Sequence, residues 1–221
     1  MARAAPGGFV YHVLNRGVGR MRLFHATRDY LAFEEIVAET LVKVPLRLCA
    51  LCLMPNHWHF VAWPEADGQL AAFFQRLTVT HATRWARAKR RVGLGHVYQG
   101  RFKSFPVETD EHFLQLVRYV ERNALRANLV TEAEAWRWSS LWIRQHGTAE
   151  QRACLSDWPV RRPQRWGAYV NRPATQRELD ALRTSVQRGR PYGGVAWTAS
   201  TAEELGLEST LRPRGRPRRP R

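Results

Sequence analysis

The sequence lacks the features by which secreted and membrane proteins are recognised. Its longest unbroken apolar run, residues 48–54, is far too short to span a bilayer. The N-terminal residues hold no apolar stretch of the length that a signal peptide needs, and three cysteines do not make a disulfide framework. We therefore expect a soluble, cytoplasmic protein with no membrane partner.

Acidic residues are also scarce. The 221-residue chain carries 35 lysines and arginines against 19 aspartates and glutamates, a net charge of +16, and no acidic residue lies between Gly68 and Val107. This excess indicates a polyanionic partner, most commonly nucleic acid. A plain RNA-binding protein would explain the charge equally well.

Basic side chains are spread along that acid-free stretch, and a run of one sign over a helix and a strand favours a track for phosphates. Trp85, Tyr98 and Phe102 are interleaved with it, and each either stacks on an unpaired base or fills the core. Trp158 and Trp166 lie in a second basic patch near the C-terminus. The basic residues of the two patches are Arg76, Arg84, Arg87, Lys89, Arg90, Arg91, Arg101, Lys103, Arg161, Arg162 and Arg165.

Apolar periodicity predicts four strands and three helices before residue 125. The helices are expected to begin at Asp29, Leu70 and Asp110, with both aspartates as N-caps. The order βαββαβ followed by a helix is that of a ferredoxin-like α+β fold, an antiparallel sheet with helices on one face. The predicted strands are residues 9–14, 46–53, 57–63 and 97–107, and the predicted helices are residues 29–42, 70–91 and 110–124.

The character of the chain changes near residue 148. Residues 1–147 are expected to form the main domain, and residues 148–210 a basic, aromatic extension with short helices. Ser200 and Glu203 have the spacing of a capping box, and Gly206 would end the short helix that follows. Residues 211–221, rich in arginine and proline, are expected to be disordered.

Two histidines form the first part of a candidate site. His57 and His59 stand two apart on a predicted strand, so both imidazoles face one side and Trp58 faces the other. Such a pair is half of a site for a divalent ion. The alternative is a pair of surface or hydrogen-bonded core histidines.

A tyrosine on the helix after Asp110 forms the second part. Tyr119 and Asn123, spaced i and i+4, lie beside one another on the flank of the apolar face. The carboxamide oxygen of Asn123 has the chemistry to complete a metal site, and Arg122 and Arg126 continue that edge as groups able to hold phosphate.

These residue types suit one reaction on DNA. The phenolate attacks a backbone phosphate, leaving a 5′-phosphotyrosine and a free 3′-hydroxyl, while a metal ion polarises the phosphate. Because the covalent link retains the phosphodiester energy, the step is reversible, and cutting can be followed by rejoining. A nuclease that uses water would need more carboxylates near the histidines than this sequence offers.

Four blocks in order resemble those of the HUH single-tyrosine transposases. The block at 54–59 resembles their His-hydrophobic-His motif, and residues 11–17, 100–104 and 118–123 resemble further blocks. The set is most similar to the REP-associated tyrosine transposases, relatives of the IS200/IS605 group. The resemblance covers about residues 9 to 145, with a C-terminal block at 206–212.

The resemblance implies a ferredoxin-like catalytic domain, a Mg²⁺ or Mn²⁺ ion, and cleavage of single-stranded DNA beside REP hairpins. It implies His57, His59 and Asn123 as ligands and Tyr119 as nucleophile, in a monomer or homodimer associated with the nucleoid. Asn123 departs from the glutamine common in the insertion-sequence relatives. The alternative is a transposase-derived protein that binds hairpins without cutting. The residues expected to bind DNA are Arg16, Arg84, Arg87, Arg90, Arg91, Arg101, Lys103, Arg122, Arg126, Arg161, Arg162 and Arg165.

Overall fold

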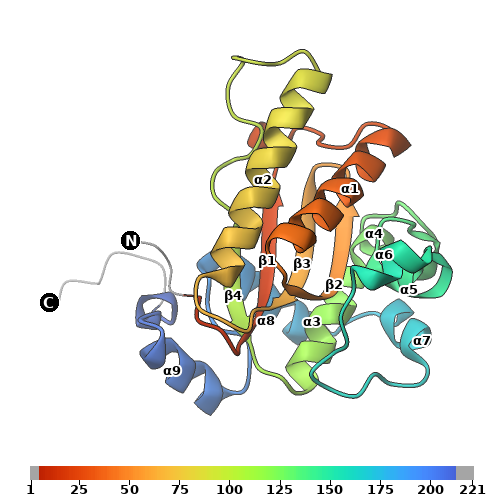
Figure 1. Cartoon of the computed structure of the whole chain (residues 1–221). Coiled ribbons are helices and arrows are strands. Elements are labelled where there is room, and N and C mark those ends of the chain that lie inside the picture. The colour runs from red at the N-terminus through yellow and green to blue at the C-terminus, as the bar shows by residue number, and fades with distance from the viewer. Residues whose placement is uncertain (1–4, 213–221) are drawn as a thin grey trace, which may run out of the picture.

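Four antiparallel strands in the order β2-β3-β1-β4 form the centre of the molecule in a computed structural model that describes residues 5–212 (Figure 1). Two long helices join them in the order β1-α1-β2-β3-α2-β4, which confirms the ferredoxin-like prediction. The elements are β1 (Val10–Arg16), α1 (Thr27–Lys43), β2 (Arg47–Met54), β3 (His57–Trp63), α2 (Gln69–Ala88) and β4 (Lys103–Val107).

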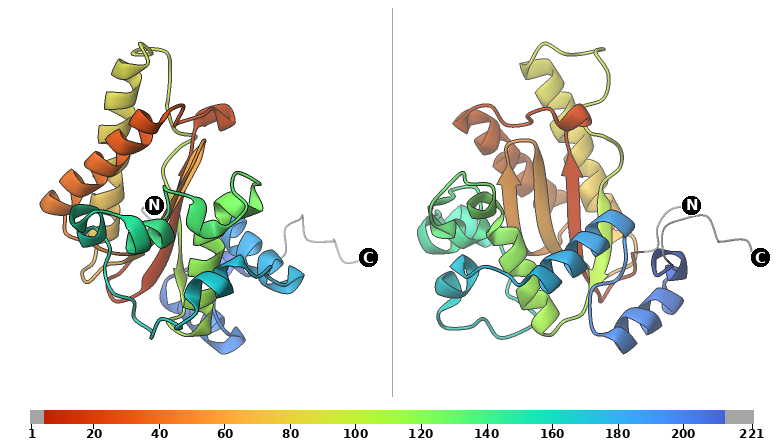
Figure 2. Two further views of the ribbon diagram at one scale, coloured as in Figure 1. Left: turned by 90° about the vertical axis from the view of Figure 1, so that its right-hand side faces the viewer. Right: turned by 180° about the vertical axis from the view of Figure 1, so that it is seen from behind.

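Helices α1 and α2 cover one face of the sheet, as the left view of Figure 2 shows. The apolar stripe expected on α2 is fully buried there, from Leu70 to Leu77. On β3, Trp58 and Phe60 point into the same layer. The alternation of that strand therefore sends its aromatic side chains to one face and its histidines to the other.

The opposite face is covered by α3 (Glu111–Glu121), which packs against β2 and β3. Phe113, Val117 and Val120 are its fully buried stripe, as expected. Asp110 caps the helix by accepting a hydrogen bond from the His112 backbone N–H at 2.7 Å. A short α4 (Asn123–Arg126) follows directly.

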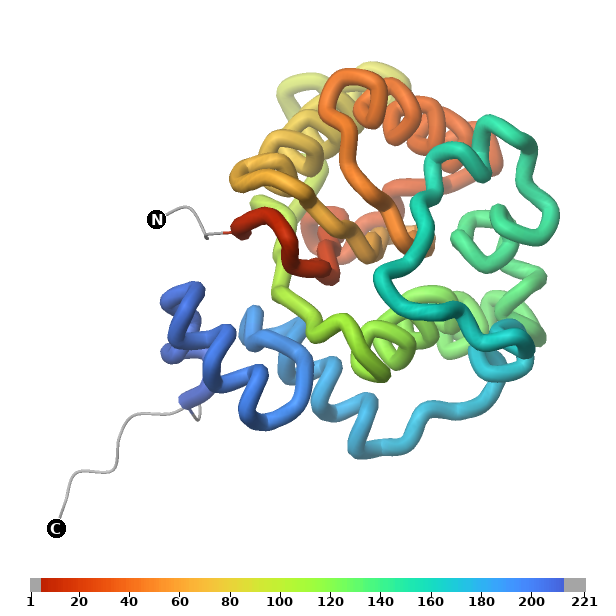
Figure 3. The backbone as a smooth tube through the Cα atoms, turned by 60° about the horizontal axis from the view of Figure 1, so that its bottom comes forward, coloured from red at the N-terminus to blue at the C-terminus, as the bar shows by residue number. Residues whose placement is uncertain are grey.

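The C-terminal part of the chain forms an outer layer on the α3 side. Figure 3 shows the backbone of α7 (Trp166–Asn171) and α8 (Gln176–Arg188) running alongside α3, and α8 contacts β4. The remaining elements are η1 (Val18–Arg20), η2 (Ala133–Ala135), α5 (Ser140–His146), α6 (Ala149–Ala153), α7 (Trp166–Asn171), α8 (Gln176–Arg188), α9 (Val195–Glu204) and η3 (Glu208–Thr210).

The outer layer is joined to α3 by a buried carboxylate. Glu121 has no exposed surface, and its two oxygens accept hydrogen bonds from Ser140 Oγ and Trp166 Nε1, each at 2.6 Å. Burial raises the pKa of the Glu121 carboxyl, although Ser140, Trp166 and two arginines act against this rise. The folded state therefore favours the protonated acid.

This buried acid predicts a pH-dependent stability. A carboxyl whose pKa is raised by folding contributes stability at low pH that is lost as the pH rises through its folded pKa. The free energy of unfolding in urea is therefore expected to fall as the pH rises above the ordinary pKa range of a glutamate carboxyl. Glu121→Gln removes the charge, while its Oε1 can still accept from Trp166 Nε1 and its Nε2 can donate to Ser140 Oγ, so it should flatten this dependence. Glu111→Gln, on the exposed side of α3, should not. An unchanged pH profile in the Glu121→Gln variant would contradict this role.

Several predicted boundaries were wrong, and the helix predicted over residues 110–124 ends at Glu121, with Asn123 in the separate α4. The N-cap of α1 is Ala26, because the Asp29 carboxylate in the first turn accepts from the backbone N–H groups of His25 and Ala26 at 2.7 and 3.1 Å. The fourth strand begins at Lys103, and residues 97–99 only bridge to the end of β1. Helix α9 starts at Val195, so Ser200 lies inside it instead of capping it, although it ends before Gly206 as expected.

The predicted disorder of the C-terminal tail concerns residues 211–221. Of these, 213–221 lie outside the described residues. Leu211 and Arg212 follow the short η3 turn.

Candidate active site

His57 and His59 project from β3 onto the α3 side of the sheet. Their rings stand edge to face, with centroids 5.0 Å apart and planes at 82°. Asn56 donates from Nδ2 to the carbonyl of Arg20 at 3.1 Å, which turns its Oδ1 toward His57 Nδ1 at 2.6 Å. His57 Nδ1 is therefore the donor, and its Nε2 keeps a free lone pair.

A third histidine, His12 of β1, joins the pair. Its Nε2 lies 2.8 Å from His59 Nδ1, and it has no exposed surface. The sequence assigned His12 no role, although it lies in the block at residues 11–17, because a single histidine in a strand does not by itself indicate a metal site. The signal that would have found it is the register that sets His12 beside His59 across β1 and β3, and no local pattern contains that register.

Tyr119 faces these histidines from α3. Its half-buried ring is perpendicular to that of His59, with centroids 6.1 Å apart and planes at 90°. The His12 ring is similarly placed, at 6.3 Å and 89°. The packing of α3 on the sheet thus brings Tyr119 next to two histidines that are distant from it in the sequence.

Asn123 and Arg126 complete the local arrangement. The guanidinium of Arg126 lies over the Tyr119 ring at 4.4 Å, and its Nη2 donates to Asn123 Oδ1 at 2.5 Å. Asn123 is buried, and its Nδ2 has no hydrogen-bond partner among the described residues. The amide oxygen predicted as a ligand is therefore beside the tyrosine but engaged by an arginine.

The three imidazoles are held neutral. Burial, together with the nearby charges of Arg16 and Arg126, lowers the pKa of His57 to about 4. Burial alone lowers the pKa of His12 to about 3, and burial with the neighbouring His12 and His57 lowers that of His59 well below its ordinary value. Neutral imidazole is the form that binds a metal ion.

The donor set fits a divalent ion. His57 and His59 each use Nδ1 for a hydrogen bond within the protein, the arrangement that orients metal-binding imidazoles. Imidazole nitrogens combined with amide, water or phosphate oxygens suit Mn²⁺ and related divalent ions. The carboxamide of Asn123 fits as an oxygen ligand once Arg126 turns elsewhere.

The basic residues expected along the acid-free stretch lie mainly on the other face of the sheet. Arg84 on α2 forms a two-point ion pair with Glu39 of α1, with contacts of 3.0 and 2.6 Å. Figures 1 and 2 place the end of α2 at the same end of the sheet as the end of β1. Of the predicted set, Arg87, Arg90, Arg91, Arg101 and Lys103 are exposed.

The interleaved aromatics fill the core. Trp85 is buried and donates from Nε1 to the Leu23 carbonyl at 2.6 Å. Tyr98 is buried too and accepts from Trp58 Nε1 at 3.0 Å. Phe102 packs against the same cluster, half-buried. The core interpretation therefore holds for all three.

In the second basic patch, too, an aromatic side chain is buried and basic side chains are exposed. Trp166 is buried against Glu121, whereas Arg161 and Arg165 are exposed. Arg162 lies over the Trp158 ring at 5.3 Å.

Burial lowers the pKa of the Arg122 guanidinium, and the charges of Arg118 and Arg126 lower it further. Arg122 therefore lies in a strongly positive neighbourhood beside Tyr119.

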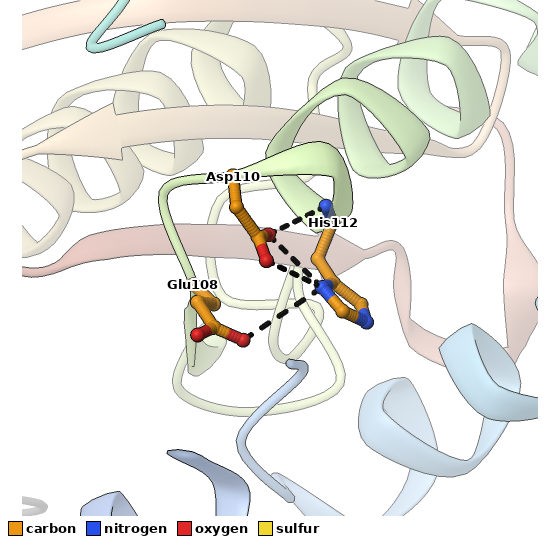
Figure 4. Close-up of side chains that lie close together, drawn as sticks. All are labelled: Glu108, Asp110 and His112. Carbon is orange, nitrogen blue, oxygen red and sulfur yellow. Dashed lines mark hydrogen bonds and ion pairs between the residues drawn. The ribbon is translucent and has the colours of Figure 1, made fainter. Parts of the chain in front are cut away.

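Away from His12, His57 and His59, the described residues contain one further group with the spacing of metal ligands. The potential ligand atoms of Glu108, Asp110 and His112 lie within 4.8 Å of one another (Figure 4). His112 Nδ1 lies 2.9 Å from Asp110 Oδ1, and Glu108 accepts from the Gly194 backbone N–H at 2.7 Å. These contacts account for the group as a helix cap that also fastens the start of α9.

Comparison with protein families gives a match over residues 8–123 to the family described as "Transposase IS200 like". The chain belongs to the IS200-like transposase family. The matched segment contains His57, His59, Tyr119 and Asn123 and ends before the C-terminal layer. No curated protein matches this IS200-like transposase.

The fold is similar to that of solved structures. A REP-associated tyrosine transposase bound to a REP hairpin is 18% identical, with a TM-score of 0.53 over 68% of this chain and 88% of that chain. A Deinococcus radiodurans chain described as a candidate transposase is 19% identical, with a TM-score of 0.39 over 51% and 88%. The first likeness shows the shared fold.

In the described part of this IS200-like transposase, no helix combines the length and the apolar character that crossing a membrane requires.

Proposed function

We propose that this protein cleaves and rejoins single-stranded DNA through a covalent bond to Tyr119, with the aid of a divalent ion held by His57 and His59. The observation that carries the proposal is the perpendicular packing of the Tyr119 ring on that of His59, with ring centroids 6.1 Å apart. His57 and His59 use Nδ1 for their hydrogen bonds within the described residues, which leaves both Nε2 atoms for an ion. A nucleophile and a metal-binding pair are thereby joined in one place.

The chemistry follows from the residues. The Tyr119 oxygen forms a bond to phosphorus as the bond from phosphorus to the 3′ oxygen breaks. The phenol gives its proton to solvent, and the departing 3′ oxygen takes one up as a hydroxyl. A bound Mg²⁺ or Mn²⁺ would polarise the phosphate oxygens. Reversal of the step onto a new 3′-hydroxyl gives rejoining.

Arginines near the tyrosine supply the positive charge that a phosphate needs. Arg126 lies over the phenol ring, and Arg16 ends β1 close enough to influence the pKa of His57. A phosphate that draws Arg126 away from Asn123 would free Oδ1 as the third ligand. Substrate binding would then complete the metal site.

The substrate proposed is single-stranded DNA that carries a hairpin of the REP kind. The net charge of +16 supports a nucleic-acid partner, and the structurally similar transposase is bound to a REP hairpin. Such a protein would act on the nucleoid, as a monomer or as a homodimer.

The proposal is tested with labelled single-stranded hairpin DNA and Mn²⁺, followed by a denaturing gel and peptide mapping. The expected result is a covalent adduct whose DNA is attached to the peptide that contains Tyr119. Free 5′-phosphate ends without an adduct would indicate a water-using nuclease and overturn the proposal.

A second candidate function is hairpin binding without cleavage. The engagement of Asn123 Oδ1 by Arg126 favours it, because the third ligand is then already occupied. Tight binding with neither cleavage nor adduct in Mg²⁺ or Mn²⁺ would decide for this candidate.

The exposed arginines at the end of α2 yield a further prediction. Replacing Arg87, Arg90 and Arg91 by alanine should weaken DNA binding and reduce the slope of log K against log salt by about 2, since each lost phosphate contact on a single strand removes about 0.7. Fluorescence anisotropy at several salt concentrations measures this slope.

The matched control is Lys43→Ala, which removes an exposed charge at the last residue of α1. It should leave the slope unchanged. An unchanged slope in the triple variant would mean that DNA does not reach α2.

A further inference from the structure

We infer that His12 is a positioning residue for the metal site: it accepts the Nδ1 proton of His59 and so keeps the Nε2 lone pair of His59 directed at the ion. The inference rests on the proposed function, because it requires His59 to be a ligand. It adds a role for a residue outside the His57-Trp58-His59 motif.

The contact between the two rings is short and isolated from water. His12 Nε2 lies 2.8 Å from His59 Nδ1, and the ring planes differ by only 4°. His12 is 0% exposed and His59 is 3% exposed. Solvent therefore has little access to replace this hydrogen bond.

The sheet holds His12 in place. His12 is opposite Val61 and His59 is opposite Leu14 in the β1–β3 ladder, so the two histidines are diagonal neighbours on one face. On its other side His12 meets the edge of Phe105, with centroids 5.0 Å apart. The backbone pairing and this aromatic neighbour restrict rotation of the His12 ring.

The proton count determines what His12 must do. A neutral imidazole carries one proton, so His59 can offer Nε2 to an ion only when its proton is on Nδ1. That proton points at His12 Nε2, which must then be an acceptor, with the proton of His12 on Nδ1. His12 Nδ1 has no hydrogen-bond partner among the described residues, so no bond there opposes this tautomer.

The neighbouring ligand has the same support from a different residue. Asn56 Oδ1 accepts from His57 Nδ1 at 2.6 Å and leaves Nε2 free. An amide oxygen therefore does for His57 what an imidazole nitrogen does for His59. The two ligands present the same atom, each through one partner next to it.

The test is the affinity for Mn²⁺ without DNA, measured from the electron paramagnetic resonance signal of the free ion. His12→Phe keeps a ring but has no acceptor, and it should weaken the affinity by about 10- to 100-fold, as loss of such a partner does. His12→Gln offers an oxygen to His59 Nδ1 and should lose less than about tenfold. His12→Leu serves if the Phe variant does not fold.

The matched control is His81→Phe. His81 is also a buried imidazole, bonded to Tyr98 Oη at 2.6 Å, but it belongs to the layer under α1 and α2. Its loss should lower thermal stability and leave the Mn²⁺ affinity unchanged.

Two outcomes would overturn the inference and leave the proposed function standing: wild-type affinity in the Phe or Leu variant, or equal losses in the Phe and Gln variants. The second would mean that packing, and not the accepted hydrogen bond, is what His12 contributes. A wild-type protein that binds no Mn²⁺ would overturn the metal site itself, and this inference with it.

Discussion

Tyr119→Phe should abolish formation of the covalent adduct and lower the rate of hairpin-DNA cleavage by at least about 10⁴-fold, because losing the nucleophile removes the step itself. The phenylalanine ring keeps the packing against His59 and beneath Arg126, so the fold and the affinity for DNA should be retained. Quantification of adduct and cleaved ends on a denaturing gel, under single-turnover conditions, measures the effect.

Tyr169→Phe is the matched control. Tyr169 is another half-buried tyrosine beneath an arginine, with the Arg118 guanidinium 4.5 Å from its ring, but it lies on α7. This variant should cleave at the wild-type rate. Persistence of the adduct in Tyr119→Phe would show that another residue is the nucleophile.

Removing both imidazoles of β3 has the second-largest expected effect. His57→Ala combined with His59→Ala should lower cleavage in Mn²⁺ by roughly 10²- to 10³-fold, because polarisation of the phosphate contributes several kcal/mol and each 1.36 kcal/mol is a factor of ten. A chelator should reduce the wild-type protein to a similar level and should not reduce the double variant further. Affinity for DNA should persist, since the arginines remain.

The control removes two exposed imidazoles instead, His25 and His146. That variant should keep both the cleavage rate and its dependence on Mn²⁺. Full cleavage by the His57/His59 variant in a chelator would refute the metal site while leaving Tyr119 in question.

Local patterns predicted the sheet and its helices well. The bounds of β3 were predicted to the residue, because strict alternation around Trp58 identifies both faces of a strand. The α2 stripe and the Asp110 cap rest on equally local chemistry. The prediction of Asp29 as the N-cap of α1 was wrong because an acidic residue stabilises a helix both at the N-cap and within the first turn, and the sequence alone does not distinguish these two positions.

Only those residues of the candidate site that belong to a local sequence pattern could be predicted from the sequence. His57 and His59 share a face because of their spacing. Tyr119 and Asn123 were predicted on one helix but lie on the consecutive helices α3 and α4, where Arg126 contacts both. His12 depends on the β1–β3 register, and the Arg126 contact with Asn123 depends on a side-chain conformation. Neither follows from local spacing, because both are set by tertiary packing.

The C-terminal layer determines when, during synthesis, helix α3 can gain its full set of supporting contacts. Three contacts support α3 from outside: Trp166 with Glu121, Glu178 with Arg118 at 2.7 Å, and Tyr192 with Gln115 at 2.5 Å, the last two across 60 and 77 residues of sequence. During synthesis, the helix that bears the tyrosine emerges well before any of these partners. The order of synthesis therefore means that the proposed nucleophile gains its final support among the last steps, and a partly made chain would lack these three contacts.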